Sequence, residues 1–395
     1  GHNIMDHHFQ VGASAVAEGY DDKYVKGRRP NGIYIPRFRN VDKKTKMKNT
    51  TLKAAAAFGL GALLMGSAAA QESVSKPVGY ETLEINQQFN YVGLRLLGAP
   101  LATSTVATAE NGAITLASGE VADGSVIVEV VDGDAAGAVV VGTVAAGSIS
   151  IPAGLLDNLE VENTVTVRAP QTLASVFGAD GASLTGSAGQ GGADLVLVPD
   201  GSGAFDTYWY SSGGFGGVGA GWKQVDPASG ESNDVDGAAV TLVYTDGLII
   251  QNRGADNSIV VSGSVKTTGT TPALTTQFNY LSTIYPAGAT LSSAFDEAGN
   301  PGVLRAGTLT ASAGQGGADL VFIPSGADFD IYWYSSGGFG GAGAGWKVVD
   351  ADTGNSNDAD STAVSLDSAS GIVIQNRGAL PQGVSIGAPA FYADL

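Results

Sequence analysis

The side chains best suited to binding chemistry are aromatic residues that occur twice along the chain. The set, which includes all four tryptophans, is Tyr208, Trp209, Tyr210 and Trp222, followed by Tyr332, Trp333, Tyr334 and Trp346. Flat aromatic faces with polar rims bind sugar rings, so the two Tyr-Trp-Tyr segments are candidate carbohydrate-binding platforms. Alternation along a strand sends Trp209 and Trp333 to the face opposite the tyrosines. One of the two faces must be core, and packing of these rings in β cores is the alternative interpretation.

A second candidate chemistry is calcium binding by an acidic loop near the C-terminus. Its oxygen-bearing residues are Asp350, Asp352, Asn355, Asp358 and Asp360. Carboxylate and amide oxygens clustered in a flexible loop are the ligands that Ca²⁺ prefers. The matching loop of the first copy has Ala228 in place of Asp352, and both loops lack the bidentate Glu of an EF-hand. A solvated hairpin loop without metal is the alternative, and no other cofactor is expected.

The first 70 residues are not expected to belong to the working protein. Met47-Lys48 and Lys53 precede an uncharged apolar run, Ala54–Met65, and small residues follow as far as Ala70. This order is typical of a secretory signal peptide, which we place at 47–70, and residues 1–46 are interpreted as an upstream extension. The apolar run is shorter than the roughly 20 residues that a membrane helix needs. Residues 71–395 contain no longer run, so no transmembrane helix is expected in the mature chain.

The predicted mature chain, 71–395, is acidic and lacks the side chains of many catalytic sites. It has 9 Lys and Arg, 33 Asp and Glu, and neither His nor Cys. This excess of negative charge argues against nucleic acid as a partner. Without imidazole or thiol there is no Ser-His-Asp triad, Cys nucleophile or zinc site with His or Cys ligands. We therefore expect a protein that is not an enzyme, and a hydrolase with paired carboxylates is the remaining catalytic hypothesis.

An internal duplication organises the mature chain. Ser187–Val196 recurs identically as Ser312–Val321, and Tyr208–Gly217 recurs as Tyr332–Gly341. Shorter identities continue to the end of each copy, at Gly219–Lys223 with Gly343–Lys347 and at Gln251–Ala255 with Gln375–Ala379. A period this long indicates duplicated domains rather than a solenoid. We predict a first domain over 71–265 and a homologous second domain over 266–395.

The first copy carries an insertion. Gln88–Tyr91 recurs as Gln277–Tyr280, but Thr172–Phe177 follows much later in the first copy than Thr290–Phe295 follows in the second. The difference predicts an insertion over 98–165, whose apolar residues alternate as in strands. Short alternating segments separated by Gly, Asp and Asn fill the rest, with one short helix per copy at the two Thr-to-Phe segments. The predicted fold class is all-β: two homologous Gly-rich β-sandwich or barrel domains in tandem, the first with a small β-rich insertion.

Two further duplicated features have structural explanations. Gly189–Gly192 and Gly213–Gly217 are glycine-rich, but neither is followed by the Lys-Ser/Thr and helix of a P-loop. We expect flexible connections between strands there. Asn252-Arg253 and Asn376-Arg377 are expected to form turns whose arginine pairs with an acid.

A resemblance rests on the order of these motifs. Phe-Asn-Tyr, Thr-Leu-x-Ser-x-Phe, Gly-Ala-Asp-Leu-Val, Tyr-Trp-Tyr, Gly-Trp-Lys and Ile-Gln-Asn-Arg-Gly follow one another over most of 80–395. With this set the chain resembles a family of exported, signal-bearing, repeat-containing bacterial proteins that occur as many paralogues and have no assigned activity. The resemblance implies export and a β fold, and it brings no catalytic residues.

Together these observations favour an exported, non-catalytic β-repeat protein that acts as a structural or cell-surface component. Its expected partners are copies of itself or a cell-surface polymer, and its expected location is extracellular, at the cell surface or in the periplasm. A carbohydrate- or polymer-binding module that uses the Tyr-Trp-Tyr strands is the alternative. A glycan-acting hydrolase is the third hypothesis.

Overall fold

The computed structural model describes residues 78–395 except 111, 157, 215–218, 327, 339–342, 368–369 and 379–382. These residues belong to one compact unit, Lys76–Leu395. The predicted extension at 1–46 and signal peptide at 47–70 lie outside the described residues. The elements are almost all antiparallel strands, so the all-β prediction is confirmed. Within the described part of the chain, no helix is long and apolar enough to cross a membrane.

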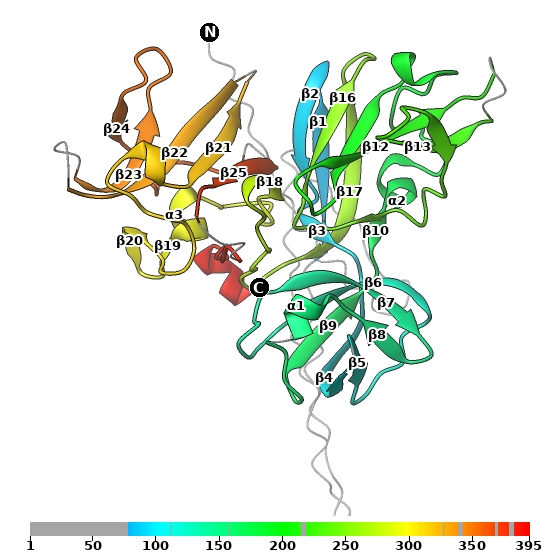
Figure 1. The fold of residues 1–395 in the computed structure, drawn as a ribbon, viewed down its shortest axis with the longest axis horizontal. Helices are drawn as coiled ribbons and strands as arrows, with labels where there is room; N and C mark the ends of the chain where they lie inside the picture. Colours follow the sequence, from blue (N-terminus) through cyan, green and yellow to red (C-terminus); the bar gives the residue numbers. More distant parts are fainter. Residues whose placement is uncertain are drawn as a thin grey trace, which may run out of the picture. The chain divides into compact units, whose positions relative to one another are not determined.

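Two six-stranded sheets dominate the fold (Figure 1). The first has the order β14-β13-β12-β11-β16-β2, and the second has the order β24-β23-β22-β21-β25-β18. The strands of the first are β2 (Gln88–Gly93), β11 (Leu195–Pro199), β12 (Phe205–Ser211), β13 (Gly221–Val225), β14 (Ser232–Asp234) and β16 (Gly247–Asn252). Those of the second are β18 (Gln277–Ser282), β21 (Leu320–Ser325), β22 (Asp328–Ser336), β23 (Ala344–Val349), β24 (Ser356–Asp358) and β25 (Gly371–Asn376). Motifs that are identical in sequence therefore occupy the same strand positions in both sheets.

A small sheet covers one face of the first six-stranded sheet. It has the order β1-β17-β3, from β1 (Val78–Ile85), β17 (Asn257–Val265) and β3 (Leu96–Leu97). Buried and exposed residues alternate along β1, as expected for a strand with one solvated face. Leu83 and Ile259 from this sheet pack with Val196, Ile250 and other buried residues of the large sheet. The first copy is therefore a sandwich of two sheets.

The second copy builds its core with less regular pairing. Two isolated bridges, Thr270 to Ile386 and Ala273 to Gly383, lie where the first copy pairs β1 with β17. Leu274 and Ile386 pack with Val321, Ile374 and further buried residues of the second large sheet. A final 3-10 helix, η4 (Ala390–Asp394), adds the buried Tyr392 to this core.

Short helices lie where the sequence predicts them. The first, α2 (Leu173–Phe177), is capped by Thr172, whose hydroxyl accepts from the Ser175 N–H at 3.1 Å while Ser175 bonds back. The second, α3 (Leu291–Phe295), has the same capping box from Thr290 and Ser293. The remaining short elements are β10 (Gln171–Thr172), β15 (Thr241–Leu242), β19 (Asp296–Glu297), β20 (Asn300–Leu304), η1 (Gln190–Gly192) and η3 (Gln315–Gly317).

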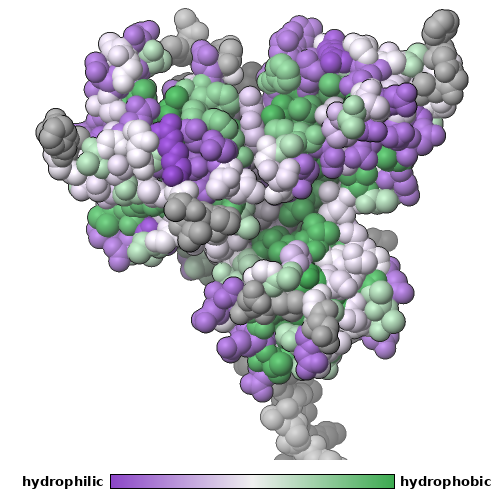
Figure 2. Space-filling model, viewed as in Figure 1, coloured by the Kyte–Doolittle hydropathy of each residue, from purple (hydrophilic) through white to green (hydrophobic). Residues whose placement is uncertain are grey.

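The predicted insertion forms a closed barrel of six strands in the order β4-β5-β8-β7-β6-β9. It comprises β4 (Pro100–Glu110), β5 (Ala113–Leu116), β6 (Gly124–Val130), β7 (Val139–Ala145), β8 (Ser148–Ser150), α1 (Ala153–Leu156) and β9 (Thr164–Arg168). Valine and isoleucine fill its interior, including Ile114, Val128 and Val165. Closure leaves the barrel with no free sheet edge. Figure 2 shows hydrophilic residues over the outer loops of both six-stranded sheets and hydrophobic residues gathered above the barrel, near the centre of the view.

Candidate functional site

One face of each six-stranded sheet carries the same row of side chains across six strands. We call this the outer face, because the opposite face packs on the cores described above. Strand pairing and packing place the row in the order Phe89, Gln251, Leu195, Trp209, Lys223 and Asp234. In the second sheet the row is Phe278, Gln375, Leu320, Trp333, Lys347 and Asp358. The structure thus brings the predicted tryptophans together with duplicated residues that the sequence analysis did not connect to them.

The middle of each row is buried although it lies on the outer face. Trp209 is 1% exposed and its indole N–H donates to the Ser232 hydroxyl at 3.0 Å. Trp333 makes the same bond to Ser356, also at 3.0 Å. Ala193 and Leu195 pack on Trp209, so residues at the end of the glycine-rich segment form a small second core there.

A buried lysine follows each tryptophan in the row. Lys223 and Lys347 are almost fully buried, and each forms an ion pair with an exposed aspartate, Asp234 or Asp358. The aspartates belong to the short strands at the free edge of each sheet. Charged residues at an edge oppose pairing with other strands. The lysine of the duplicated Gly-Trp-Lys motif therefore holds the edge strand, β14 or β24, through this ion pair.

Arginine holds the glycine-rich segment in place. The Arg253 guanidinium donates from Nη1 to the carbonyls of Gln190 and Ala193, at 2.5 and 3.1 Å, and from Nη2 to Gln251 Oε1 at 2.9 Å. Arg377 makes equivalent bonds to Gln315 and Gln375. The arginine meets an acid through its backbone N–H, which donates to Asp194 or Asp319, whereas the described partners of its guanidinium are carbonyl and amide oxygens. The expectation of flexible glycine connections stays a prediction: Gln190–Gly192 forms the 3-10 helix η1, which the arginine ties to the end of β16, and 215–217 lie outside the described residues.

The acid near each of these turns binds backbone N–H groups and not the arginine side chain. Asp194 is fully buried and its carboxylate accepts from the backbone N–H groups of Thr185 and Arg253, both at 2.7 Å. Asp319 accepts from Thr310 and Arg377 in the same way, at 2.7 and 2.6 Å. One buried carboxylate thus fixes two loops in each copy. The duplicated Gly-Ala-Asp and Gln-Asn-Arg-Gly motifs are two halves of a single hydrogen-bonded structure.

The predicted aromatic platform is not exposed. The core faces of the two sheets bury three of these residues fully, Tyr208, Trp222 and Trp346, and three partly, Tyr210, Tyr332 and Tyr334. The outer faces bury the other two, Trp209 and Trp333. Tyr210 packs edge-on against Trp222 at 5.7 Å, and burial raises the pKa of Tyr208 to about 12. The strand alternation is as predicted, but both faces are covered. A carbohydrate platform of exposed Tyr-Trp-Tyr rings is therefore a prediction that the burial of these residues corrects.

The predicted calcium residues have other partners. The Asp350 carboxylate accepts from the Thr353 N–H and hydroxyl at 2.8 Å, and Asp360 accepts similarly from Thr362. These hydrogen bonds lower the pKa of both carboxyls. Asp358 pairs with Lys347, whereas the side chains of Asp352 and Asn355 are exposed. No three acidic side chains gather as a metal site in the described ranges.

A buried charge cluster joins the barrel to the rest of the unit. Glu129 of β6 accepts from Arg168 Nε at 2.7 Å, from Lys266 Nζ at 3.4 Å and from the Tyr244 hydroxyl. All four side chains are buried. A cavity of about 10 Å³ beside them, lined in part by Arg168, Gln171 and Tyr244, has room for one water molecule. No local sequence pattern marks this cluster, because its members are up to 137 residues apart.

The two copies meet through equivalent residues. Tyr91 packs edge-on against Phe329 with ring centroids 4.8 Å apart, and Phe205 packs against Tyr280 at 4.6 Å. Tyr91 and Tyr280 occupy the same motif position, as do Phe205 and Phe329. Gly93 lies so close to the other copy that a Cβ atom would be 2.0 Å from the Ser370 carbonyl oxygen. Reciprocal contacts of this kind are typical of a two-fold interface between identical subunits.

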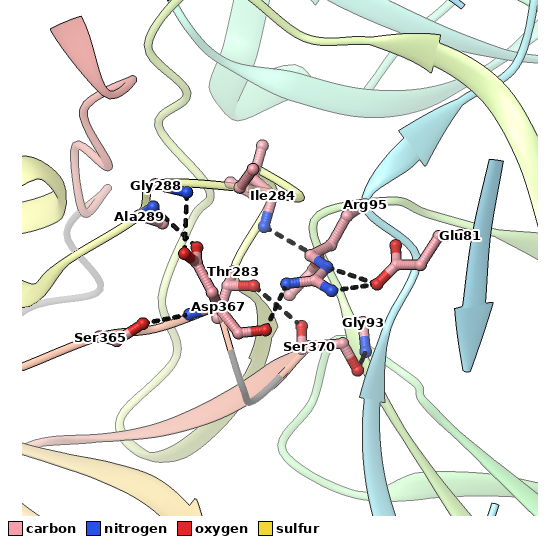
Figure 3. Close-up of polar contacts among 12 residues, drawn as sticks. Glu81, Gly93, Arg95, Thr283, Ile284, Gly288, Ala289, Ser365, Asp367 and Ser370 are labelled. Atoms are coloured by element: carbon pink, nitrogen blue, oxygen red, sulfur yellow. Dashed lines mark hydrogen bonds and ion pairs between the residues drawn. The ribbon is translucent and has the colours of Figure 1, made fainter. Parts of the chain in front are cut away.

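A buried ion pair lies beside this interface. Arg95 pairs with Glu81 and donates from Nη1 to the Asp367 carbonyl at 3.1 Å (Figure 3). The Asp367 carboxylate accepts from the N–H groups of Gly288 and Ala289, at 2.9 and 2.8 Å. Figure 3 shows Arg95 between Glu81 and the segment that carries Asp367. The first copy thus contributes a cation that binds the second copy's backbone.

Asp246 is expected to make the stability of the chain depend on pH. It pairs with Leu281 of the other copy in an isolated bridge, and burial raises the pKa of its carboxyl to about 7. The folded chain binds a proton at Asp246 more tightly than the unfolded chain does, and this difference stabilises the fold. The stabilisation is fully present below about pH 4 and is lost as the pH rises to about 7. Asp246→Ser, which introduces the residue found at the equivalent position 370, should stabilise the chain at pH 8 by about 4 kcal/mol and leave stability at pH 4 little changed. Denaturant unfolding at both pH values measures this, with Asp236→Ser as an exposed control; equal gains at both pH values would contradict it.

Comparisons with models of protein families, with curated proteins and with solved structures found no match to this chain.

Proposed function

We propose that the chain is an exported, non-catalytic β-repeat protein that serves as a structural component of the cell surface or extracellular space. The observation that carries the proposal is the reciprocal packing of Tyr91 on Phe329 and of Phe205 on Tyr280. The duplicated residues form cores, sheet edges and contacts between the copies. These are structural roles, as expected for a repeat in a structural protein. The order of the motifs, with its resemblance to exported paralogous proteins, supports the same proposal.

The buried acids support a non-catalytic role. In the described part of the chain the least exposed acids are Glu81, Glu129, Asp194, Asp296 and Asp319. Asp246, the described carboxyl whose pKa burial raises, accepts from the Thr245 hydroxyl and lies where the first copy meets Leu281 of the second. Each already accepts from an arginine, a lysine, an indole, a hydroxyl or backbone N–H groups. A general acid for glycoside hydrolysis needs a carboxyl that is protonated and faces substrate. Carboxyl groups that are already bound to internal donors do not meet that need.

Light scattering of the secreted protein tests the proposal. The gene is expressed with its leader, and the intact mass of the exported product should correspond to a chain beginning at Gln71. The particle mass should then grow with protein concentration, with and without calcium. Tyr91→Ala with Phe329→Ala should reduce this growth because it loosens the pairing of the copies, whereas Tyr80→Ala should not. An unprocessed product, or a monomer that is indifferent to concentration and calcium, would contradict the proposal.

A further inference from the structure

Positive charge reaches solvent at two equivalent places in the described chain. Arg95, Arg168, Lys223, Lys266 and Lys347 are buried. Arg305 is partly buried and donates to Ser385 and to the Asp296 carbonyl. The exposed cations among the described residues are Arg253 and Arg377, which occupy the same position in the two copies. In a chain of strong negative charge, their guanidinium groups mark two local sites for an anionic group.

An exposed phenylalanine lies beside each of these arginines. Phe89 is 56% exposed and Phe278 is 42% exposed. Phe89 pairs across the sheet with Gln251, whose Oε1 accepts from Arg253, and Phe278 pairs with Gln375, which accepts from Arg377. Each copy therefore presents a ring, an amide and a guanidinium side by side. We call these trios the Phe-Gln-Arg patches.

The backbone that presents each ring is held in an unusual conformation. Gln88 and Gln277, which precede the two phenylalanines, have φ angles of +79° and +77°. Such angles are uncommon for residues other than glycine. The Asn90 amide holds the turn by accepting from the Asn86 N–H at 2.9 Å and donating to the Asn86 carbonyl at 2.7 Å, and Asn279 bonds to Thr275 in the same way. The same strained backbone conformation occurs before Phe89 and before Phe278, which points to a function for the exposed position of these two rings.

We propose that the two Phe-Gln-Arg patches bind a polysaccharide that contains uronic acid residues. The C–H face of a sugar ring stacks on Phe89 or Phe278, and the sugar carboxylate pairs with Arg253 or Arg377. The guanidinium groups are already positioned by bonds to carbonyl oxygens, so little side-chain freedom is lost on binding. Two equivalent patches on one chain allow two segments of the same polymer to bind together, which raises the overall affinity.

The surrounding charge restricts which anionic polymer fits. A net charge of −24 over 71–395 opposes the binding of any polyanion, so an anionic group binds only where a local cation acts together with an uncharged contact. A polymer of uronic acids carries one carboxylate on each sugar, at the spacing of the rings themselves. Each Phe-Gln-Arg patch therefore binds such a polymer by stacking one sugar ring on the phenylalanine and pairing one carboxylate with the arginine.

Titration with polygalacturonate tests the proposal on the full mature chain. We expect binding by isothermal calorimetry, and loss of binding when the polymer's carboxyls are methyl-esterified, because the sugar rings are then unchanged and the charge is gone. Phe89→Ala with Phe278→Ala should weaken binding by about tenfold or more, and either single change should leave one patch working. Tyr80→Ala, which removes an exposed ring 61% accessible on another sheet, is the matched control.

Three results would overturn the proposal. Absence of polygalacturonate binding by the wild-type chain would do so, as would equal binding of the esterified polymer. Binding that survives loss of both phenylalanines would also do so. If the double variant lowers particle mass in light scattering but the wild type binds no polymer, the patches contact a second copy instead.

Discussion

Replacing Glu129 by alanine should lower the free energy of unfolding by about 3–5 kcal/mol. The carboxylate is the shared partner of Arg168, Lys266 and Tyr244, and removing it leaves two cations buried without a counter-charge. Burial alone would raise the pKa of Glu129, but Lys266 and Arg168 outweigh it and hold the pKa below its usual value. The stabilisation is therefore present at neutral pH and is lost as pH falls through the range where the carboxyl binds a proton.

Urea unfolding followed by tryptophan fluorescence measures the Glu129 effect. Glu110→Ala, at an exposed barrel position, is the matched control and should leave stability within about 0.5 kcal/mol of wild type. Because Glu129 and Arg168 belong to the barrel whereas Tyr244 and Lys266 do not, proteolysis should also cut the variant faster around the barrel. Stability of Glu129→Ala equal to that of the Glu110 control would show that the cluster does not hold the barrel in place.

The strands and the repeat could be predicted from the sequence because their signals are local. Period-2 alternation identifies the barrel strands, and the identical segments Tyr208–Ser211 and Tyr332–Ser335 fall on equivalent strands, β12 and β22, of the two sheets. The capping residues Thr172 and Thr290 likewise predict the start of the two short helices. Closure of the insertion into a barrel depends on pairing β4 with β9, which are about 60 residues apart, and no local pattern encodes that choice.

The candidate sites were harder to predict because burial depends on distant segments. Alternation correctly separates Trp209 from its neighbouring tyrosines, but the outer face is covered by a loop that Arg253, which follows the neighbouring strand β16, holds in place. The exposed Phe89 was visible in the sequence only as part of a repeated motif. Its neighbour in space, Gln251, comes 162 residues later. A signal did exist, since both residues recur in the second copy, but it does not say that they are adjacent.

Replacing Asp194 by alanine should destabilise the chain by about 3 kcal/mol, and Asp319→Ala should have an effect of the same sign in the second copy. Each carboxylate is buried and accepts from backbone N–H groups of two loops, which would be left without a partner. Loss of the turn at Arg253 should also release the segment that covers Trp209. We therefore expect iodide to quench tryptophan emission more strongly in the folded variant than in wild type.

Two control variants separate the buried acceptor from a general effect of removing acids. Asp200 accepts from the Ser202 N–H in an exposed turn, where water can replace the carboxylate, so Asp200→Ala should cost much less stability. Asp194→Asn retains one acceptor oxygen and should fall between wild type and the alanine variant. If Asp194→Ala and Asp200→Ala have equal stability and equal quenching, the duplicated carboxylate does not fix the two loops. If only quenching changes, the carboxylate holds the cover of Trp209 without contributing to the stability of the sandwich.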